Sequence, residues 1–384
     1  MSSEPCIEEN VFPFLDLPGL LQHSVLNLIT DLREKFRLRL ICRSFRDLLD
    51  SKECWRSSNW LSIEKKQFYS HYVVNGLKVF EHKISQAVGD LCQRIVIQDL
   101  TLDATAEVPI SPEAMVRIIH ELHRVENRAK LQRLQLLNST MPMILPSFIA
   151  FSPSLRSVTF MRNSTPLLHD QSVAFWYVIG HSDLLSEFCY VGAGHQDMET
   201  HRLRDALMHK PLTKLHLESI SHLYTETVMD LCESFPTALK KLTILRCPNV
   251  AVPKLVRHLS AKMRANLESL QVSFPDGEAA ERFSLLMLHF VPNLKRCTIA
   301  REGDLEFYSI DAAVAVLGHL LASLQDHNPR LLVEIRSENN SMVAVKLLES
   351  DWCGRLEIFK DEQEVKWFLA TSGQAQILFP AHQQ

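Results

Sequence analysis

The stretch LTKLHL at residues 212–217 recurs as LKKLTI at residues 239–244 and as LESLQV at residues 267–272. Each copy has an apolar residue at its first and fourth positions and again at its sixth. Side chains two residues apart point to the same side of a strand, so each copy is typical of a short strand with one buried face. A strand this short is not stable alone. Stacking such units in parallel buries their apolar side chains, which predicts a repeat architecture.

The same apolar pattern continues on both sides of this stretch. Its other clear copies are Cys92-Ile95-Ile97, Leu131-Leu134-Leu136, Leu155-Val158-Phe160, Leu185-Phe188-Tyr190 and Leu294-Cys297-Ile299, and weaker copies lie at Val333-Ile335 and Cys353-Leu356-Ile358. Parallel strands need a crossover, and the segments between the copies have helical spacing. Ser111 and Pro112, for example, are a typical N-cap and first-turn pair ahead of an apolar stripe. The pattern predicts an α/β fold for residues 92–370.

This array resembles the leucine-rich repeats. The resemblance implies a solenoid with parallel strands on a concave face and helices outside. The family favours Asn or Cys three residues after the strand pattern, where this sequence has only Asn163 and Cys247. We therefore expect an irregular, distorted solenoid. For the copies after Arg330, ordinary strands of another α/β fold remain an equally open interpretation.

A second informative stretch, LPGLLQHSVLNLITDLREKFRLRLICRSFRDLLDSKECW, occupies residues 17–55. Leu21, Val25, Leu28 and Ile29 have the spacing of one helical face, and a second helical run follows a charged turn. About forty residues form a small unit that can bury little surface. Its apolar content exceeds what a pair of helices can hide, which favours a surface that binds a partner.

This stretch resembles an F-box, with Leu17-Pro18, then Leu21, Val25, Leu26 and Ile29, then Leu40-Ile41-Cys42-Arg43-x-Phe45-Arg46-x-Leu48, and finally Trp55. Leu20 stands where the family usually has an acidic residue. The resemblance implies a small all-helical domain at residues 12–61 that binds a Skp-type adaptor. The implied adaptor contacts, some of which must belong to the internal core, are Leu17, Pro18, Leu21, Val25, Leu26, Ile29, Leu40, Ile41 and Trp55. A helical hairpin that merely caps the repeats is the alternative.

Three further segments complete the predicted organisation. Residues 1–11 are acidic and are expected to form a disordered tail. Residues 62–91 have aromatic and aliphatic residues at roughly helical spacing, which predicts a helical connector. Residues 371–384 are expected to form a C-terminal tail.

Composition excludes several classes of protein. The chain has 384 residues, a net charge of −4 and 22% charged residues, so no global attraction to nucleic acid is expected. Its nine cysteines include no CxxC pair, which argues against a zinc site or a disulfide framework and favours a reducing compartment. Neither a secretory signal nor a membrane-spanning run is found. A cytoplasmic or nuclear location, away from the membrane, is the expectation.

No catalytic or cofactor motif is found. His120-Glu121-Leu122-His123 has the two histidines one residue too close for the zinc-protease motif, and Gly192-Ala193-Gly194 lacks the third glycine of a dinucleotide site. Cysteines at strand positions are expected to be buried and inert. The chain is therefore expected to have no catalytic residues, no metal and no cofactor.

Residues that alternate with the buried strand positions are candidates for binding a protein substrate. The candidates on this face are Arg133, Gln135, Lys214, His216, Lys241 and Arg296. Basic residues outnumber acidic ones there, which favours an acidic or phosphorylated segment as the ligand. A solvated face of mixed charge is the simpler interpretation, and both stay open.

Together the two resemblances imply a substrate-recognition subunit of a Skp–cullin–F-box ubiquitin ligase. Its partners would be a Skp-type adaptor, through it a cullin, and a protein substrate. A leucine-rich-repeat scaffold that degrades nothing shares all of these features and remains the alternative.

Overall fold

The computed structural model describes residues 14, 17–29, 32–55, 59–65, 71–104, 110–123, 131–137, 151–161, 169–192, 200–235, 239–274, 293–301, 332–336, 355–360, 366–372 and 375–380. The chain divides into two compact units, residues 1–132 and residues 133–384. The predicted tail at residues 1–11 lies outside the described part of the chain.

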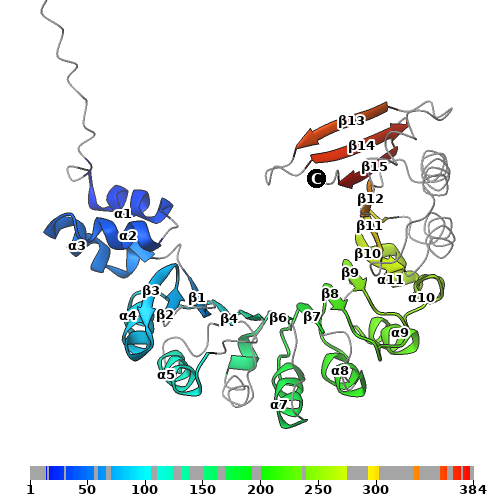
Figure 1. The fold of residues 1–384 in the computed structure, drawn as a ribbon, viewed down its shortest axis with the longest axis horizontal. Helices are drawn as coiled ribbons and strands as arrows, with labels where there is room; N and C mark the ends of the chain where they lie inside the picture. The colour runs from blue at the N-terminus through cyan, green and yellow to red at the C-terminus, as the bar shows by residue number, and fades with distance from the viewer. Residues whose placement is uncertain are drawn as a thin grey trace, which may run out of the picture. The chain divides into compact units, whose positions relative to one another are not determined.

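The first unit begins with a helical segment and continues as a small sheet with two more helices (Figure 1). The helical segment consists of α1 (Gly19–Leu28), α2 (Leu32–Leu38), α3 (Arg43–Asp50) and the 3-10 turn η2 (Lys52–Trp55). The rest of the unit consists of β1 (Trp60–Lys65), β2 (His71–Val74), β3 (Leu77–Phe80), the 3-10 turn η3 (Glu81–Lys83), α4 (Ile84–Arg94), β4 (Asp99–Ala104) and α5 (Pro112–Leu122). The strand order is β3-β2-β1-β4, with β1 parallel to β4.

The prediction of a helical connector over residues 62–91 is wrong for its first part, which forms β1, β2 and β3. The reason is the Asn75-Gly76 turn between β2 and β3, where both residues have positive φ, 46° and 83°. Asn and Gly tolerate this conformation, which matches the twist of a tight hairpin. Asn75 is buried, its Oδ1 accepts from the Ser62 amide at 2.6 Å, and its Nδ2 donates to the Trp60 carbonyl at 2.9 Å. The turn is therefore fixed to β1, and only α4 is helical.

The first predicted repeat copy is also misplaced. Cys92 lies in α4, whereas the strand begins at Asp99 and has Leu100 and Leu102 as its buried residues. These two leucines pair in register with Leu61 and Ile63 of β1. The helix at α5 is confirmed, because Ser111 accepts from the Ala114 amide and Pro112 occupies the first turn.

The second unit is an α/β array of successive parallel strands with helices between them. Its strands are β5 (Arg133–Leu137), β6 (Ser157–Met161), β7 (Glu187–Val191), β8 (Lys214–Glu218), β9 (Lys241–Leu245), β10 (Ser269–Phe274), β11 (Arg296–Arg301), β12 (Leu332–Arg336), β13 (Arg355–Lys360), β14 (Lys366–Ser372) and β15 (Ala375–Pro380). Its helices are α7 (His169–Gly180), α8 (Thr200–Leu207), α9 (Thr225–Ser234), α10 (Val252–His258) and α11 (Ala261–Asn266). From β5 to β12, each strand pairs in parallel with the next.

The buried side chains of this array repeat from strand to strand. Leu215 of β8 pairs in register with Leu242 of β9, which pairs with Leu270 of β10, and each is at most 1% exposed. The helices α7, α8 and α9 lie on one side of strands β6 to β9 (Figure 1). They bury apolar residues such as Leu203 and Val228. The predicted α/β architecture with a long, mostly parallel sheet is confirmed for this unit.

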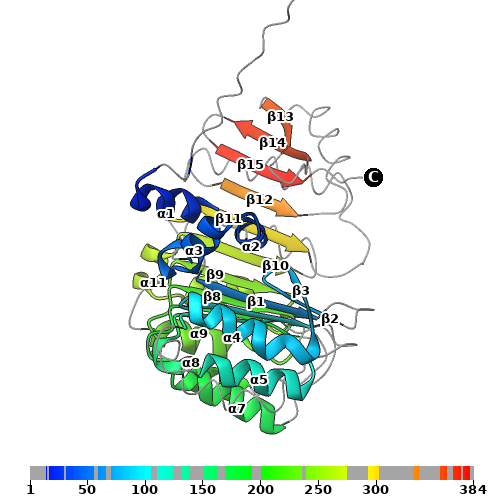
Figure 2. The same ribbon diagram turned by 90° about the vertical axis from the view of Figure 1, so that its left-hand side faces the viewer.

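The C-terminal end of the array differs from the prediction. Residues 371–384 were expected to be a tail, but Ala375–Pro380 form β15, which pairs in parallel with β12. The copy at residues 353–358 does lie at a strand, β13, yet β13 and β14 pair antiparallel at the end of the sheet. Figure 2 shows β12 and β15 running in one direction and β14 in the other. The array therefore ends in an antiparallel ladder and not in further repeats.

Candidate functional site

The first candidate surface lies on α1 in the helical segment. Leu21, Val25 and Leu28 share one face of this helix because they are spaced about one turn apart, and Leu20 lies at the edge of that face. All four side chains are exposed, Leu20 by 83% and Leu28 by 80%. We call these four residues the α1 stripe. Large aliphatic side chains grouped in this way on a helix are typical of a surface that another protein covers.

The opposite face of α1 holds the helix against the rest of the unit. Leu26 is 1% exposed, and Gln22 beside it on that face is also buried. Pro18 is the residue before the helix, and its carbonyl accepts from the amides of Leu21 and Gln22 at 2.8 and 3.1 Å. The Ser51 hydroxyl lies 3.4 Å from His23 Nε2. One face of α1 is therefore anchored while the α1 stripe is left open.

A second exposed apolar pair follows α2. Leu40 and Ile41 lie in the turn between α2 and α3 and are 80% and 64% exposed. The turn itself is ordered by backbone hydrogen bonds from the Leu40 amide to the Arg37 carbonyl at 2.9 Å and from the Ile41 amide to the Leu38 carbonyl at 3.1 Å. Two large aliphatic side chains are therefore exposed to solvent on an ordered turn.

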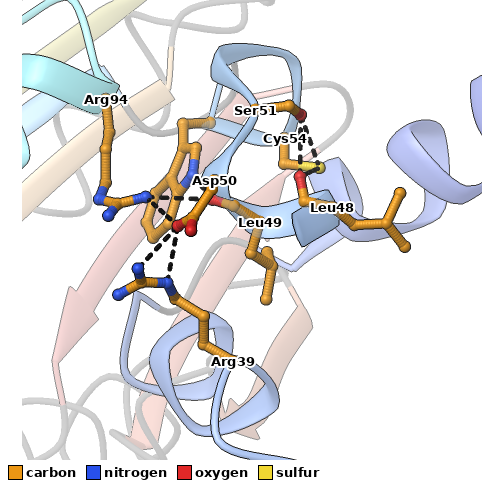
Figure 3. A network of polar contacts seen from close by, with 8 residues as sticks. Arg39, Leu48, Leu49, Asp50, Ser51, Cys54 and Arg94 are labelled. Atoms are coloured by element: carbon orange, nitrogen blue, oxygen red, sulfur yellow. Dashed lines mark hydrogen bonds and ion pairs between the residues drawn. The ribbon is translucent and has the colours of Figure 1, made fainter. Parts of the chain in front are cut away.

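A polar network ties this helical segment to α4 (Figure 3). Asp50, at the end of α3, accepts from Arg39 Nε at 2.8 Å and from Arg94 Nη1 at 2.6 Å. Burial on its own raises the pKa of Asp50, but the hydrogen bonds and charges of Arg94 and Arg39 outweigh burial and lower it. Asp50 is therefore ionised at neutral pH and holds both arginines in place.

Beside this network, Trp55 forms the core of the segment. Its Nε1 donates to the Leu49 carbonyl at 2.6 Å, and Arg94 lies over its ring at 5.9 Å. Lys35 is fully buried, donates to the Cys54 carbonyl at 2.7 Å, and lies 5.4 Å from the Trp55 ring centroid. Burial lowers the pKa of Lys35. These contacts order the helices without using the α1 stripe.

The residues that the sequence suggests as adaptor contacts are partly exposed and partly buried in the structure. Pro18, Leu21, Val25, Leu40 and Ile41 are exposed, and Leu17 and Ile29 are partly exposed. Leu26 and Trp55 are buried, so their assignment as direct contacts is wrong and their role is to hold the core. Leu20 and Leu28 are exposed on the same helix but are absent from those contacts, although Leu28 has the helical spacing of Leu21 and Val25.

The second candidate surface is one face of the second unit's sheet. It is formed by the side chains that alternate along each strand with the buried ones. We call it the open face. Strand register aligns its residues in rows, one of which reads Ser157, Glu187, Lys214, Lys241, Ser269 and Arg296 from β6 to β11. The next row reads Thr159, Cys189, His216, Thr243, Gln271 and Thr298, of which Thr298 is buried. The rows place residues distant in sequence side by side.

On β7 and β8 the charges of the open face are paired with one another. Lys214 donates to Glu187, His216 Nε2 lies 2.8 Å from Glu218 Oε2, and Arg246 donates to Glu218. The hydrogen bond from His216 lowers the pKa of Glu218, and Arg246 lowers it further against the effect of burial. The two carboxylates of this part of the face are therefore both paired with cations of the protein itself.

Burial alone would lower the pKa of His216, but hydrogen bonds and charges of Cys189 and Glu218 outweigh it and raise that pKa to about 9. An unfolded His titrates near 6.5, so the folded protein keeps the proton that the unfolded chain loses. The resulting stabilisation is complete below pH 6.5 and is lost as pH rises through about 9.

We expect the free energy of unfolding of the wild-type chain to fall relative to that of His216→Gln over this pH range. The expected relative loss is about 1 to 2 kcal/mol after allowance for solvent screening. Urea denaturation of both proteins across the range measures it. Parallel pH profiles for the two proteins would contradict the assignment.

The candidate substrate contacts also differ from one another in the structure. Arg133, Gln135, Lys241 and Arg296 are exposed, whereas Lys214 and His216 are partly buried and paired. No group of three or more potential metal-ligating side chains occurs in the part of the chain that the structure describes. None of the helices there has the length and apolar character that crossing a membrane requires.

A comparison of the chain with protein-family models finds no matching model, and a comparison with curated proteins finds no match. The α1 stripe and the open face are the two candidate binding surfaces of the chain.

Proposed function

We propose that this chain is the substrate-recognition subunit of a Skp–cullin–F-box ubiquitin ligase. In this proposal the helical segment is an F-box that binds a Skp-type adaptor, which joins it to a cullin. The second unit is a leucine-rich-repeat array whose open face holds a protein substrate. The site of action would be the cytoplasm or the nucleus.

The observation that carries the proposal is the α1 stripe. Four large aliphatic side chains are exposed on one face of a helix whose other face is anchored through Leu26. Covering a Leu or Val side chain with a partner is worth about 1.5 to 3 kcal/mol. The stripe and the Leu40-Ile41 turn together offer apolar surface for a complex, and Leu21, Val25, Leu40 and Ile41 among them are positions that the F-box resemblance assigns to the adaptor.

The open face supports the second half of the proposal. Parallel strands present rows of polar side chains at fixed spacing, and such extended surfaces are what repeat proteins use to bind other proteins. The chain itself would contribute proximity. Holding a substrate beside a charged conjugating enzyme converts a bimolecular transfer into an effectively intramolecular one.

The test is reconstitution with purified components. The chain is co-expressed with a Skp-type adaptor, and the complex is then combined with a cullin, its RING subunit, ubiquitin and the activating and conjugating enzymes. We expect a 1:1 complex with the adaptor and ubiquitylation of proteins that co-purify with the second unit. Adaptor binding without ubiquitylation of any bound protein would favour the non-degradative scaffold. Absence of adaptor binding would contradict both the ligase subunit and the adaptor-bound scaffold.

A further inference from the structure

The two halves of the open face differ in how their polar groups are satisfied. On β7 and β8 the charged groups pair with one another. On β9, β10 and β11 the structure records no side-chain hydrogen bond or ion pair for a group of five polar residues that we call the β9–β11 platform. Its members are Lys241, Thr243, Ser269, Gln271 and Arg296.

Register places the platform residues on a regular grid. Lys241, Ser269 and Arg296 are in one row across three adjacent parallel strands, and Thr243 and Gln271 are in the next. Lys241 and Arg296 are both exposed. With neighbouring strands about 4.8 Å apart, the two cationic residues start about 10 Å apart on the same face. The strands hold this spacing fixed, so the surface can favour a ligand whose negative charges have the same spacing.

The charge surrounding the platform is also positive. Glu268, just before β10, is flanked by Lys295 at 2.8 Å and Lys240 at 3.8 Å. The hydrogen bond from Lys295 lowers the pKa of Glu268. Its single negative charge is shared by Lys295, Lys240 and Lys241, whose charges all lower the same pKa, so the positive charge around the platform exceeds the negative charge once Arg296 is added. An anionic partner is the complement that this surface lacks.

We propose that the β9–β11 platform binds an acidic segment of a partner protein that carries carboxylates three residues apart. The inference rests on the proposed function only in taking the ligand to be the substrate protein. An extended polyproline II segment has three residues per turn and a rise of about 3.1 Å, so side chains i and i+3 lie on one face about 9 Å apart. This distance matches the separation of Lys241 and Arg296.

The remaining platform groups fit the same ligand. A polyproline II segment makes no internal hydrogen bonds, so its backbone carbonyls are free to accept. Ser269, Thr243 and Gln271 carry side-chain donors next to the two cations. Two separate single charges on an open sheet suit two carboxylates, one for each cation, better than a single dianion.

The experiment measures peptide binding to the full-length chain by fluorescence anisotropy at low ionic strength. The probe is a fluorescein-labelled peptide with Glu at every third position among prolines and alanines. Two further peptides have the same composition with the Glu residues adjacent, or one phosphoserine replacing all of the Glu residues. We expect the first peptide to bind several-fold tighter than either of the others, with affinity falling as salt is added.

The decisive variant is Lys241→Gln with Arg296→Gln, which should weaken binding of the first peptide by about tenfold or more. Its matched control is Lys254→Gln with Arg257→Gln on α10, which removes the same charge from exposed helix positions and should leave binding unchanged. Equal loss in both variants would show a nonspecific charge effect and overturn the proposal. The proposal would also be overturned if the platform variant bound the first peptide as tightly as the wild type, if the phosphoserine peptide bound tightest, or if no peptide bound.

Adaptor co-purification is measured on the same variants. The platform variant should retain the adaptor like the wild-type chain, and a circular dichroism spectrum and urea-unfolding curve like those of the wild type show that its second unit is folded. If the wild-type chain binds the adaptor but not the peptide, the platform proposal is wrong and the proposed function stands. If it binds the peptide but not the adaptor, the proposed function is wrong and the platform is still a peptide-binding surface.

Discussion

Replacing Leu21 and Leu28 by Glu should abolish binding of a Skp-type adaptor while leaving the chain folded. Leu28 is 80% and Leu21 51% exposed, so the free protein loses little packing. In the complex each change removes about 1.5 to 3 kcal/mol of apolar burial and adds the cost of burying a charge. A combined loss of more than about 4 kcal/mol weakens binding about a thousandfold.

The measurement is isothermal titration of each purified chain with purified adaptor, alongside circular dichroism. Val116→Glu is the matched control, because Val116 is an exposed aliphatic residue on α5 in the same unit. It should bind the adaptor like the wild type. Undiminished binding by the double variant, with its helical signal intact, would exclude the α1 stripe as the contact surface.

Trp55→Ala should cause the largest loss of stability among changes in the helical segment. Trp55 is 1% exposed and packs beneath Arg94 and beside buried Lys35. Removing a buried tryptophan typically costs about 3 to 5 kcal/mol. The change also leaves the Leu49 carbonyl without the indole donor and deprives a buried ammonium of its aromatic neighbour. We expect loss of helical signal from the first unit and, with it, loss of adaptor binding.

Trp55→Phe separates packing from hydrogen bonding in this core. It keeps an aromatic ring but loses the Nε1 donor to Leu49, and it should be milder than Trp55→Ala by about 2 kcal/mol or more. Urea denaturation monitored by circular dichroism compares the three proteins. Wild-type stability in Trp55→Ala would mean that the ring does not hold the segment together.

The parallel array was predictable because its signal is local and repeated. Leu215 and Leu217 lie two residues apart on a strand, and the same pair recurs as Leu242 and Ile244. A single apolar pair is ambiguous, but stacking in register needs the pair to recur, and the structure shows that it does. The α5 helix was predictable for a similar reason, since Ser111 and Pro112 mark its start.

The strand β2 was not predicted because it lacks the alternation that marks a half-buried strand. Tyr72, Val73 and Val74 are all buried, so successive side chains on both sides of β2 are apolar. Such a run cannot be distinguished from a helix by periodicity. The Asn75-Gly76 dipeptide was the available signal, since it favours a two-residue hairpin turn.

The C-terminal ladder depended on information that local sequence does not contain. That β15 lies between β12 and β14 and pairs with both is decided by which strands are nearby in the fold. A tail and a strand of six residues can have the same composition. The prediction of a tail therefore failed at Ala375–Pro380.

The candidate surfaces were only partly predictable for a related reason. Helical spacing places Leu26 and Leu28 two residues apart on different faces of α1, but only the fold decides that Leu26 is the one that is buried. Likewise, sequence alternation places Lys214 and Lys241 on the same face. Only strand register shows that Lys214 lies beside Glu187 and pairs with it, whereas Lys241 lies beside Ser269.

Site-specific photo-cross-linking tests the central claim, that the α1 stripe is the surface a Skp-type adaptor covers. A photoreactive phenylalanine analogue is placed at residue 28, or at residue 116 as the control, and each chain is irradiated with purified adaptor. We predict a covalent adaptor adduct from residue 28 and none from residue 116. No adduct from residue 28 under conditions in which the two proteins co-purify, or equal adducts from both positions, would contradict the claim.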